Sequence, residues 1–120
     1  MLYVVMQCTV RTEEVYHVIT QLKKGALELC VLCSLEGGDK YGYELVQSIS
    51  EEIEVSEGTI YPLLKRIRDE KFVKTYIRES TEGPPRRYYA LTDEGVEHKI
   101  ALLDQWRTFS KAVNKLTQGG

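Results

Sequence analysis

The sequence predicts a mostly α-helical protein of the α+β class, with a small β-hairpin and a long helix at its C-terminal end. Three observations support this prediction. Apolar residues recur at helical spacing over most of the 120-residue chain, alternation replaces that spacing only between residues 73 and 91, and helical spacing returns after Thr92. A hydrophobic content of 42% and a charged content of 28% are ordinary for one globular domain of this length.

Two helices are predicted in the first third of the chain. Thr12 opens the first helix, which is short and amphipathic and ends at Gly25. The second covers residues 26–35, which are nearly all apolar, so it is expected to be buried on most sides. Cys30 and Cys33 lie inside this second helix. Because no second cysteine pair or nearby histidine completes a metal site, we interpret both as core residues and predict no metal or cofactor.

The next two helices are joined by a short acidic turn and form a predicted helix-turn-helix. The first has an apolar residue at every fourth position from Tyr41 to Ile53. The second covers Ser56–Arg68, and its apolar stripe follows the i, i+3, i+4, i+7 spacing of one helix face: Ile60, Leu63, Leu64 and Ile67. The opposite face combines hydroxyl and cationic groups, and this mixture suits a groove lined by phosphate.

The start of the second of these helices is left open by the sequence. Ser56 is a suitable N-cap, because its hydroxyl can accept a hydrogen bond from a free amide of the first turn. Pro62 favours a later start at Thr59, since proline is tolerated in a first turn but removes a hydrogen bond further along. Either start presents a helix N-terminus that attracts phosphate. An ordinary amphipathic helix with a solvated face is the alternative interpretation.

Alternating residues predict two β-strands after this helix, one over residues 73–78 and one over residues 86–91. Ser80–Pro85 connects them, and its two prolines stiffen the tip. Arg86 and Arg87 therefore emerge from a rigid turn, where they can contact phosphate or enter a minor groove, whose negative potential favours arginine. A helix-turn-helix followed by such a basic hairpin is a winged helix-turn-helix.

Positive charge is concentrated in this region. The formal net charge of the chain is −2, and residues 36–57 carry seven acidic residues against one lysine. Residues 61–90 carry eight cations against four acidic residues, so this block has a net charge of +4. A basic block inside an acidic protein indicates a local contact surface for nucleic acid rather than indiscriminate coating of it.

Other features narrow the class of protein. Three cysteines, an odd number, and the lack of a signal peptide predict a cytoplasmic location. The apolar start of the chain ends within ten residues, too few to span a bilayer, so no membrane association is predicted. His17 and His98 are isolated, and no serine, glycine loop or carboxylate pair forms a catalytic pattern. We therefore predict that the protein is not an enzyme.

A long final helix is predicted to begin after Thr92, which caps it. One apolar stripe follows the 4, 3, 4, 3 spacing of a coiled-coil seam: Leu102, Trp106, Phe109, Val113 and Leu116. A second stripe is expected to pack against the helix's own domain: Val96, Ile100 and Leu103. At 1.5 Å per residue the helix is roughly 40 Å long and protrudes from the domain. The seam then predicts a homodimer.

Four segments together resemble the PadR-type family of transcriptional regulators, in the family's order: GALELCVL from Gly25, YGYE from Tyr41, VSEGTIYPLL from Val55 and GPPRRYYALT from Gly83. The resemblance implies a winged helix DNA-binding domain over residues 24–92 and a homodimer formed through residues 1–23 and 93–120. It also implies repression at a palindromic operator in double-stranded DNA, relieved by a small planar hydrophobic effector. Residues 1–11 make the N-terminus longer than is usual in the family.

Nine residues are candidate DNA contacts by position: Lys40, Tyr41, Ser56, Thr59, Tyr61, Lys65, Arg66, Arg86 and Arg87. Of these, Lys65 and Arg66 are the expected groove contacts. Core packing is the competing interpretation for Tyr61, and Tyr89 is expected to be a core residue. In some family members an aromatic residue at the dimer interface stacks on planar ligands, and Trp106 falls at that place in the seam.

Simple burial competes with this role for Trp106, because aromatic residues at seam spacing are usually buried. The alternative for the whole protein is a winged helix that contacts other proteins and binds no DNA, a role that needs no basic tip.

Overall fold

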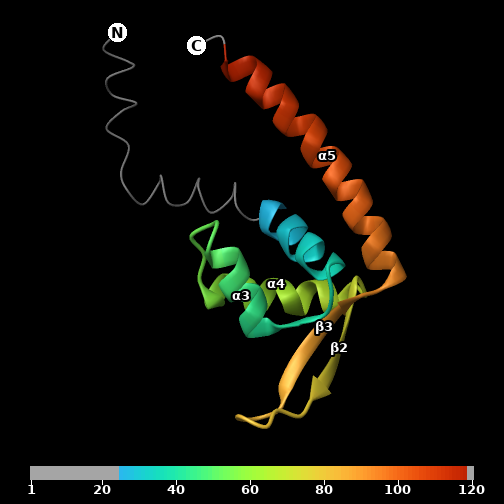
Figure 1. The fold of residues 1–120 in the computed structure, drawn as a ribbon. Helices are drawn as coiled ribbons and strands as arrows, with labels where there is room; N and C mark the ends of the chain where they lie inside the picture. The colour runs from blue at the N-terminus through green and yellow to red at the C-terminus, as the bar shows by residue number, and fades with distance from the viewer. Residues whose placement is uncertain (1–24, 119–120) are drawn as a thin grey trace.

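The computed structural model of the protein describes residues 25–118. A helix over residues 25–36 is followed by six further elements (Figure 1): β1 (Lys40–Tyr41), α3 (Gly42–Ser50), α4 (Glu57–Asp69), β2 (Val73–Arg78), β3 (Arg86–Leu91) and α5 (Asp93–Thr117). The predicted mostly helical α+β class is confirmed. The helix predicted from Thr12 and the N-terminal residues 1–11 lie outside the described residues.

The core lies where the helix over residues 25–36 meets α3 and α4. Its fully buried side chains come from the predicted apolar stripes: Leu27, Val31, Leu32, Leu45, Ile60, Leu64 and Ile67. Burial of one such side chain is worth roughly 1.5–3 kcal/mol, so these stripes decide which face of each helix turns inward. Cys30 packs against this core as predicted, and burial, followed by the nearby Cys33, raises the pKa of its thiol.

The structure shows where α4 begins. Ser56 is the N-cap, and its carbonyl oxygen accepts hydrogen bonds from the backbone N–H groups of Thr59 (3.0 Å) and Ile60 (3.2 Å). The predicted side-chain cap is wrong, because no backbone N–H donates to the Ser56 hydroxyl. A start at Thr59 is also wrong. Pro62 lies inside the helix, where it has no N–H to donate to the preceding turn.

The predicted hairpin is confirmed, and the sheet contains one more strand. β3 lies in the centre and pairs antiparallel with β2 on one side and with β1 on the other. In β1, Lys40 pairs with Tyr89 and Tyr41 pairs with Tyr88. The sequence did not predict β1 because two residues are too few to show alternation. Tyr89 is buried, as predicted.

α5 begins as predicted and is fixed against the end of α4. The Thr92 hydroxyl accepts a hydrogen bond from the Gly95 N–H (3.0 Å) and donates one to the Lys71 carbonyl (2.7 Å). Lys71 has a left-handed backbone conformation (φ 67°) that ends α4. Gly95 is buried so closely against Phe72 that an added Cβ would collide with the Phe72 carbonyl group.

One expectation for α5 is wrong. Val96 and Ile100, which were expected to pack against the helix's own domain, are 40% and 57% exposed. Gly95 and Lys99 are buried there instead, and Leu102 packs against the core. Lys99 reaches this position because its aliphatic stem can be buried while its ammonium donates to Glu36 Oε2 (2.6 Å).

The buried residues of α5 continue the predicted seam toward its N-terminus. From Gly95 the spacing 4, 3, 4, 3 leads to Lys99, Leu102 and then to Trp106, so one stripe runs along the whole helix. Its first half packs against the protein's own domain, where Leu102 is half-buried, and the place of Leu102 in a dimer interface stays a prediction. Its second half is exposed: Trp106, Phe109, Val113 and Leu116.

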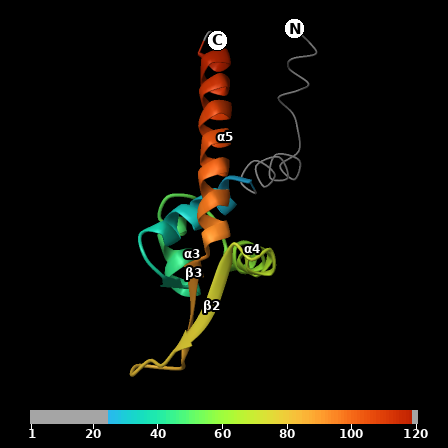
Figure 2. The same ribbon diagram turned by 90° about the vertical axis from the view of Figure 1, so that its right-hand side faces the viewer.

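The hairpin and the C-terminal half of α5 project from opposite ends of the molecule. Figure 2 shows the β2–β3 tip pointing away from the helices at one end and α5 extending beyond them at the other. A contact made by the exposed half of α5 therefore leaves the hairpin uncovered.

Replacing Gly95 with alanine should lower the free energy of unfolding by about 2 kcal/mol or more, because the new Cβ forces Phe72 and α5 apart. Urea denaturation followed by circular dichroism measures this. Gly58→Ala in the first turn of α4 is the matched control, since its Cβ would meet nothing closer than the Ser56 hydroxyl at 3.6 Å. Helix propensity predicts that the control is unchanged or more stable by up to about 1 kcal/mol. Equal effects of the two substitutions would contradict this packing.

Candidate nucleic-acid interface

α4 turns a polar face to solvent, opposite its buried stripe. Lys65 lies in the middle of this face, one turn after Tyr61, and both side chains are exposed. Ser56 and Thr59 are exposed in and before the first turn, with their hydroxyl oxygens 3.4 Å apart. Within residues 25–118 Lys65 forms no ion pair. The face therefore offers one uncompensated cation and two hydroxyls to an anionic partner.

Arg66 does not belong to this free face, although it was predicted to contact a groove. Its Nη1 lies 3.3 Å from Glu28 Oε1 and 3.2 Å from Glu70 Oε1. Burial lowers the pKa of the Arg66 guanidinium, but the charges and hydrogen bonds of Glu28 and Glu70 more than offset this, and the net shift is upward. Arg66 thus joins α4 to the helix over residues 25–36, and its contact with DNA stays a prediction. Glu28 also lies 3.5 Å from Nε2 of His98 in α5.

Lys40 also has an internal partner. Its Nζ donates a hydrogen bond to the Ser34 carbonyl (2.8 Å), near the end of the helix over residues 25–36, where carbonyl groups lack intrahelical donors. Lys40 is thus half-buried and bonded to the backbone, and its contact with DNA stays a prediction. Tyr41 lies next to it as the N-cap of α3, and its N–H donates to Glu44 Oε1 (3.2 Å).

Tyr61 connects α4 to the start of α3. Its ring lies so close to Gly42 that an added Cβ there would be 2.8 Å from Tyr61 Cε1. The pKa of Tyr61 is raised, first by burial and then by the nearby Glu57, Tyr89 and Tyr41. Tyr61 nevertheless remains 40% exposed. Tyr61 therefore packs against Gly42 with one side of its ring and is also accessible to a partner. The structure is compatible with both interpretations of Tyr61, core packing and DNA contact.

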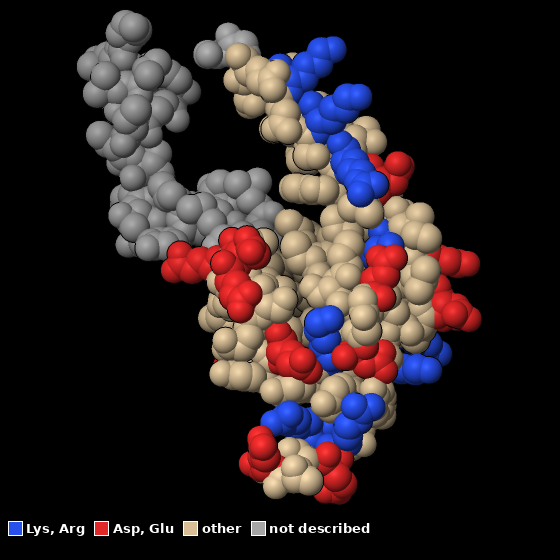
Figure 3. All heavy atoms as spheres, viewed as in Figure 1, with Lys and Arg blue, Asp and Glu red and all other residues tan. Residues whose placement is uncertain are grey.

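The two arginines predicted at the wing lie on opposite faces of the hairpin. Arg86 is opposite Arg78 on β2, whereas Arg87 is opposite Ile77. Because side chains alternate along a strand, Arg86 shares its face with Tyr88, and Arg87 shares the other face with the exposed Ile77. In the space-filling view, cationic side chains gather over the hairpin, with acidic side chains beside them at the tip (Figure 3).

A row of tyrosines crosses the sheet beside Arg86. Tyr41, Tyr88 and Tyr76 come from β1, β3 and β2 at directly paired positions. The ring centroids of Tyr41 and Tyr88 are 5.7 Å apart, and those of Tyr88 and Tyr76 are 5.6 Å apart. The Tyr76 hydroxyl donates to Asp39 Oδ2 (2.7 Å), and this hydrogen bond raises the pKa of Tyr76. We call Tyr41, Tyr88 and Tyr76 the tyrosine row.

Sequence reasoning missed Arg78, Tyr76 and Asp39 as parts of this surface. The alternation of residues in β2 and β3 could have indicated which side chains lie on this surface, because residues at directly paired positions share a face. The pairing of Arg78 with Arg86 requires the strand register, however, and Asp39 meets Tyr76 across 37 residues of sequence.

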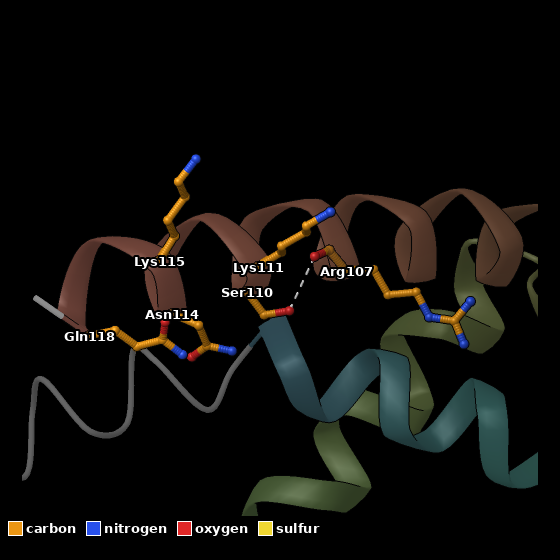
Figure 4. A pocket seen from close by; sticks show the side chains of 6 residues that line it. All are labelled: Arg107, Ser110, Lys111, Asn114, Lys115 and Gln118. Atoms are coloured by element: carbon orange, nitrogen blue, oxygen red, sulfur yellow. Dashed lines mark hydrogen bonds between the residues drawn. The ribbon is translucent and has the colours of Figure 1, made fainter.

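The second half of α5 presents an apolar surface. Phe109 and Leu116 are 62% and 82% exposed, and the rings of Trp106 and Phe109 are tilted against each other with centroids 6.5 Å apart. A shallow pocket lies on the polar side of the same helix and is lined by Arg107, Ser110, Lys111, Asn114, Lys115 and Gln118 (Figure 4). Trp106 does not line this pocket, so the pocket is no site for a ligand stacked on Trp106.

Two further properties concern only the part of the chain that the structure describes. Between residues 25 and 118, no three histidine, cysteine, aspartate or glutamate side chains are grouped so that they could hold a metal ion. None of the helices in this range has the length and apolar character needed to cross a membrane.

The sequence and the fold both match known proteins. The model of the PadR-like transcriptional regulator family matches residues 31–99. A PadR-like transcriptional regulator from Bacillus cereus strain ATCC 14579 is 40% identical, with a TM-score of 0.75, and the match covers 83% of this chain and 99% of that chain.

Two other solved structures are also similar. A Streptococcus transcriptional regulator is 39% identical with a TM-score of 0.73, over 80% of this chain and 96% of that chain. A PadR family transcriptional regulator from Eggerthella lenta DSM 2243 is 29% identical with a TM-score of 0.76, over 90% and 96% of the two chains. The polar face of α4 and the hairpin thus lie in a fold shared with transcriptional regulators.

Proposed function

The chain belongs to the PadR-like family of transcriptional regulators, and from this premise we propose that it is a ligand-responsive repressor that binds a palindromic promoter site as a homodimer. Membership of the family supports the coarser statement that the protein is a DNA-binding transcriptional regulator. We place it with the DNA in the cytoplasm and assign it no catalytic step.

The exposed face of α4 is the observation that supports DNA binding most directly. Lys65 is exposed and forms no ion pair among residues 25–118, whereas the adjacent Arg66 is neutralised by Glu28 and Glu70. A recognition helix needs an uncompensated donor toward base edges or phosphates, and lysine is suited to guanine and to phosphate. We infer that Lys65, with Ser56, Thr59 and Tyr61 around it, contacts the major groove.

The wing supplies the second part of the proposed contact. Arg87 lies beside Ile77 on one face of the hairpin, and Arg86 lies beside the tyrosine row on the other. A rigid basic hairpin next to a recognition helix can position the protein on the phosphate backbone without reading sequence. We therefore assign sequence preference to α4 and positioning to the wing.

The exposed half of the α5 seam supports a homodimer. Its four side chains lie on one side of the helix at heptad spacing, and a monomer would leave this apolar stripe in water: Trp106, Phe109, Val113 and Leu116. A second copy offers the same stripe, and a twofold interface covers both. Two copies would present two α4 helices to a palindromic site.

The proposed effector is a small planar hydrophobic molecule. Trp106 and Phe109 are the aromatic residues of the exposed seam, and their rings lie in contact. In a dimer four such rings meet at the interface, and a planar ligand would stack between them. We propose that such a ligand changes the packing of α5 and thereby the spacing of the two α4 helices.

The wild-type protein should bind a duplex of its own upstream DNA more tightly than a scrambled duplex of the same composition, and it should lose affinity steeply with salt. If a dimer neutralises about six phosphates, the affinity should fall roughly 10³-fold between about 50 and 200 mM salt. Fluorescence anisotropy of both duplexes across this range measures the effect. Absent binding, a flat salt response or equal affinity for the two duplexes would instead favour the protein-contact module.

Phe109→Arg should convert the homodimer to a monomer, because it places two like charges in a closely packed apolar interface. Sedimentation equilibrium measures the mass. Thr108→Arg is the matched control, since it adds the same side chain at the neighbouring exposed position outside the seam. We expect Thr108→Arg to remain dimeric. Two dimeric variants, or a monomeric wild-type protein, would contradict the proposed interface.

A further inference from the structure

Arg78 and Arg86 face each other across the hairpin. They are directly paired at the end of β2 and the start of β3, next to the loop that forms the tip. Directly opposed residues of an antiparallel pair lie on the same face, with Cβ atoms about 4.5–5.5 Å apart, and like charges at these positions destabilise the pair. The sequence thus places two positive charges where they repel each other.

Neither arginine forms an ion pair in the described part of the chain. Between residues 25 and 118, the ion pairs of the other arginines and lysines include neither Arg78 nor Arg86. Arg66 provides the contrast, because it is held by two glutamates where it joins α4 to the helix over residues 25–36. Arg78 and Arg86 therefore lie beside each other with no ion-pair partner among residues 25–118.

The tyrosine row holds both guanidinium groups in place. The Arg78 guanidinium carbon lies 4.6 Å from the ring centroid of Tyr88 and 5.7 Å from that of Tyr76. The Arg86 guanidinium carbon lies 4.5 Å from the ring centroid of Tyr41. An aromatic ring attracts the face of a guanidinium and leaves its N–H edge available, and this edge is the part that binds a phosphate in bidentate fashion.

The row is itself anchored to the helix-turn-helix. The Tyr76 hydroxyl is bonded to Asp39, and Tyr41 is the N-cap of α3. Arg87 lies on the other face of the hairpin with Ile77 and takes no part in this arrangement.

We propose that Arg78 and Arg86 form a clamp for one phosphate group of the DNA backbone, with the tyrosine row fixing the two guanidinium groups on either side of it. The phosphate removes the repulsion that the free hairpin bears, and the two arginines supply charge-assisted hydrogen bonds. The clamp rests on the proposed DNA-binding function and adds to it a backbone contact at Arg78. Because a phosphate is present in every sequence, the clamp fixes the position of the wing and not its sequence preference.

Arg78→Gln tests the clamp against Lys74→Gln. Lys74 is exposed on the same face of the same strand, but it is opposite Ala90 and so faces no second cation. Both variants lose one charge. We expect Arg78→Gln to bind the upstream and the scrambled duplex more weakly than the wild type, by about tenfold for each wing on the DNA, because each wing loses one set of charge-assisted hydrogen bonds. The slope of log affinity against log salt should fall by about one for each wing on the DNA, and Lys74→Gln should change neither quantity.

A second measurement tests phosphate binding by Arg78 and Arg86 in the absence of DNA. The arginine Nε–H resonances of the wild-type protein are followed by NMR while inorganic phosphate replaces chloride at constant ionic strength. We expect the resonances of Arg78 and Arg86 to move together, and that of Arg87 to stay in place.

Each outcome decides one of the two proposals. If the wild type binds DNA and Arg78→Gln binds like Lys74→Gln, the clamp is wrong and the proposed function stands. If the wild type binds no DNA, the proposed function fails, and the phosphate titration decides the clamp: movement of both resonances supports an anion site, and no movement overturns it.

Discussion

The burial of one apolar stripe on α4 is the constraint on which the rest of the structure depends. Ile60, Leu64 and Ile67 are fully buried, and rotating α4 about its axis would expose them at a cost of roughly 1.5–3 kcal/mol each. This burial turns Lys65 outward and Arg66 toward Glu28. Lys65, which forms no ion pair among residues 25–118, and Arg66, which is paired with Glu28, are thus neighbours in sequence. The packing of α4 determines which of the two cations is paired.

The orientation of α5 also depends on an apolar stripe, which packs against the protein's own domain and, in the proposed homodimer, against a second copy. A single heptad stripe runs along α5, and the domain covers the stripe as far as Leu102. Beyond Leu102 the stripe is exposed to solvent. Because both halves of the stripe belong to one helix, the packing of α5 against its own domain fixes the orientation of the proposed interface. A shift of α5 at Trp106 would move Gly95 against Phe72 and, through Glu28 and His98, would reach α4. We propose this connection as the route by which the proposed effector at the seam would act on α4.

Local patterns were enough to predict the helices, the hairpin and the cap at Thr92, because each depends on residues close in sequence. The sequence did not show contacts with residues that are distant along the chain. The carboxylate that binds Arg66 is 38 residues away, and β1 exists only through pairing with β3. The stripe of α5 was misread because Lys99 is charged and Gly95 has no side chain, yet both are buried. Arg78 was missed because its pairing with Arg86 depends on strand register.

The central claim is that two copies of α4 and the wing meet DNA as a symmetric pair, and hydroxyl-radical footprinting of the upstream DNA tests it most directly. We expect two protected patches related by twofold symmetry, with centres about 34 Å apart, one turn of the double helix, or a multiple of that distance. Weaker protection should flank each patch where a wing lies on the backbone. A single patch, or unbroken protection along the duplex, would contradict the symmetric pair.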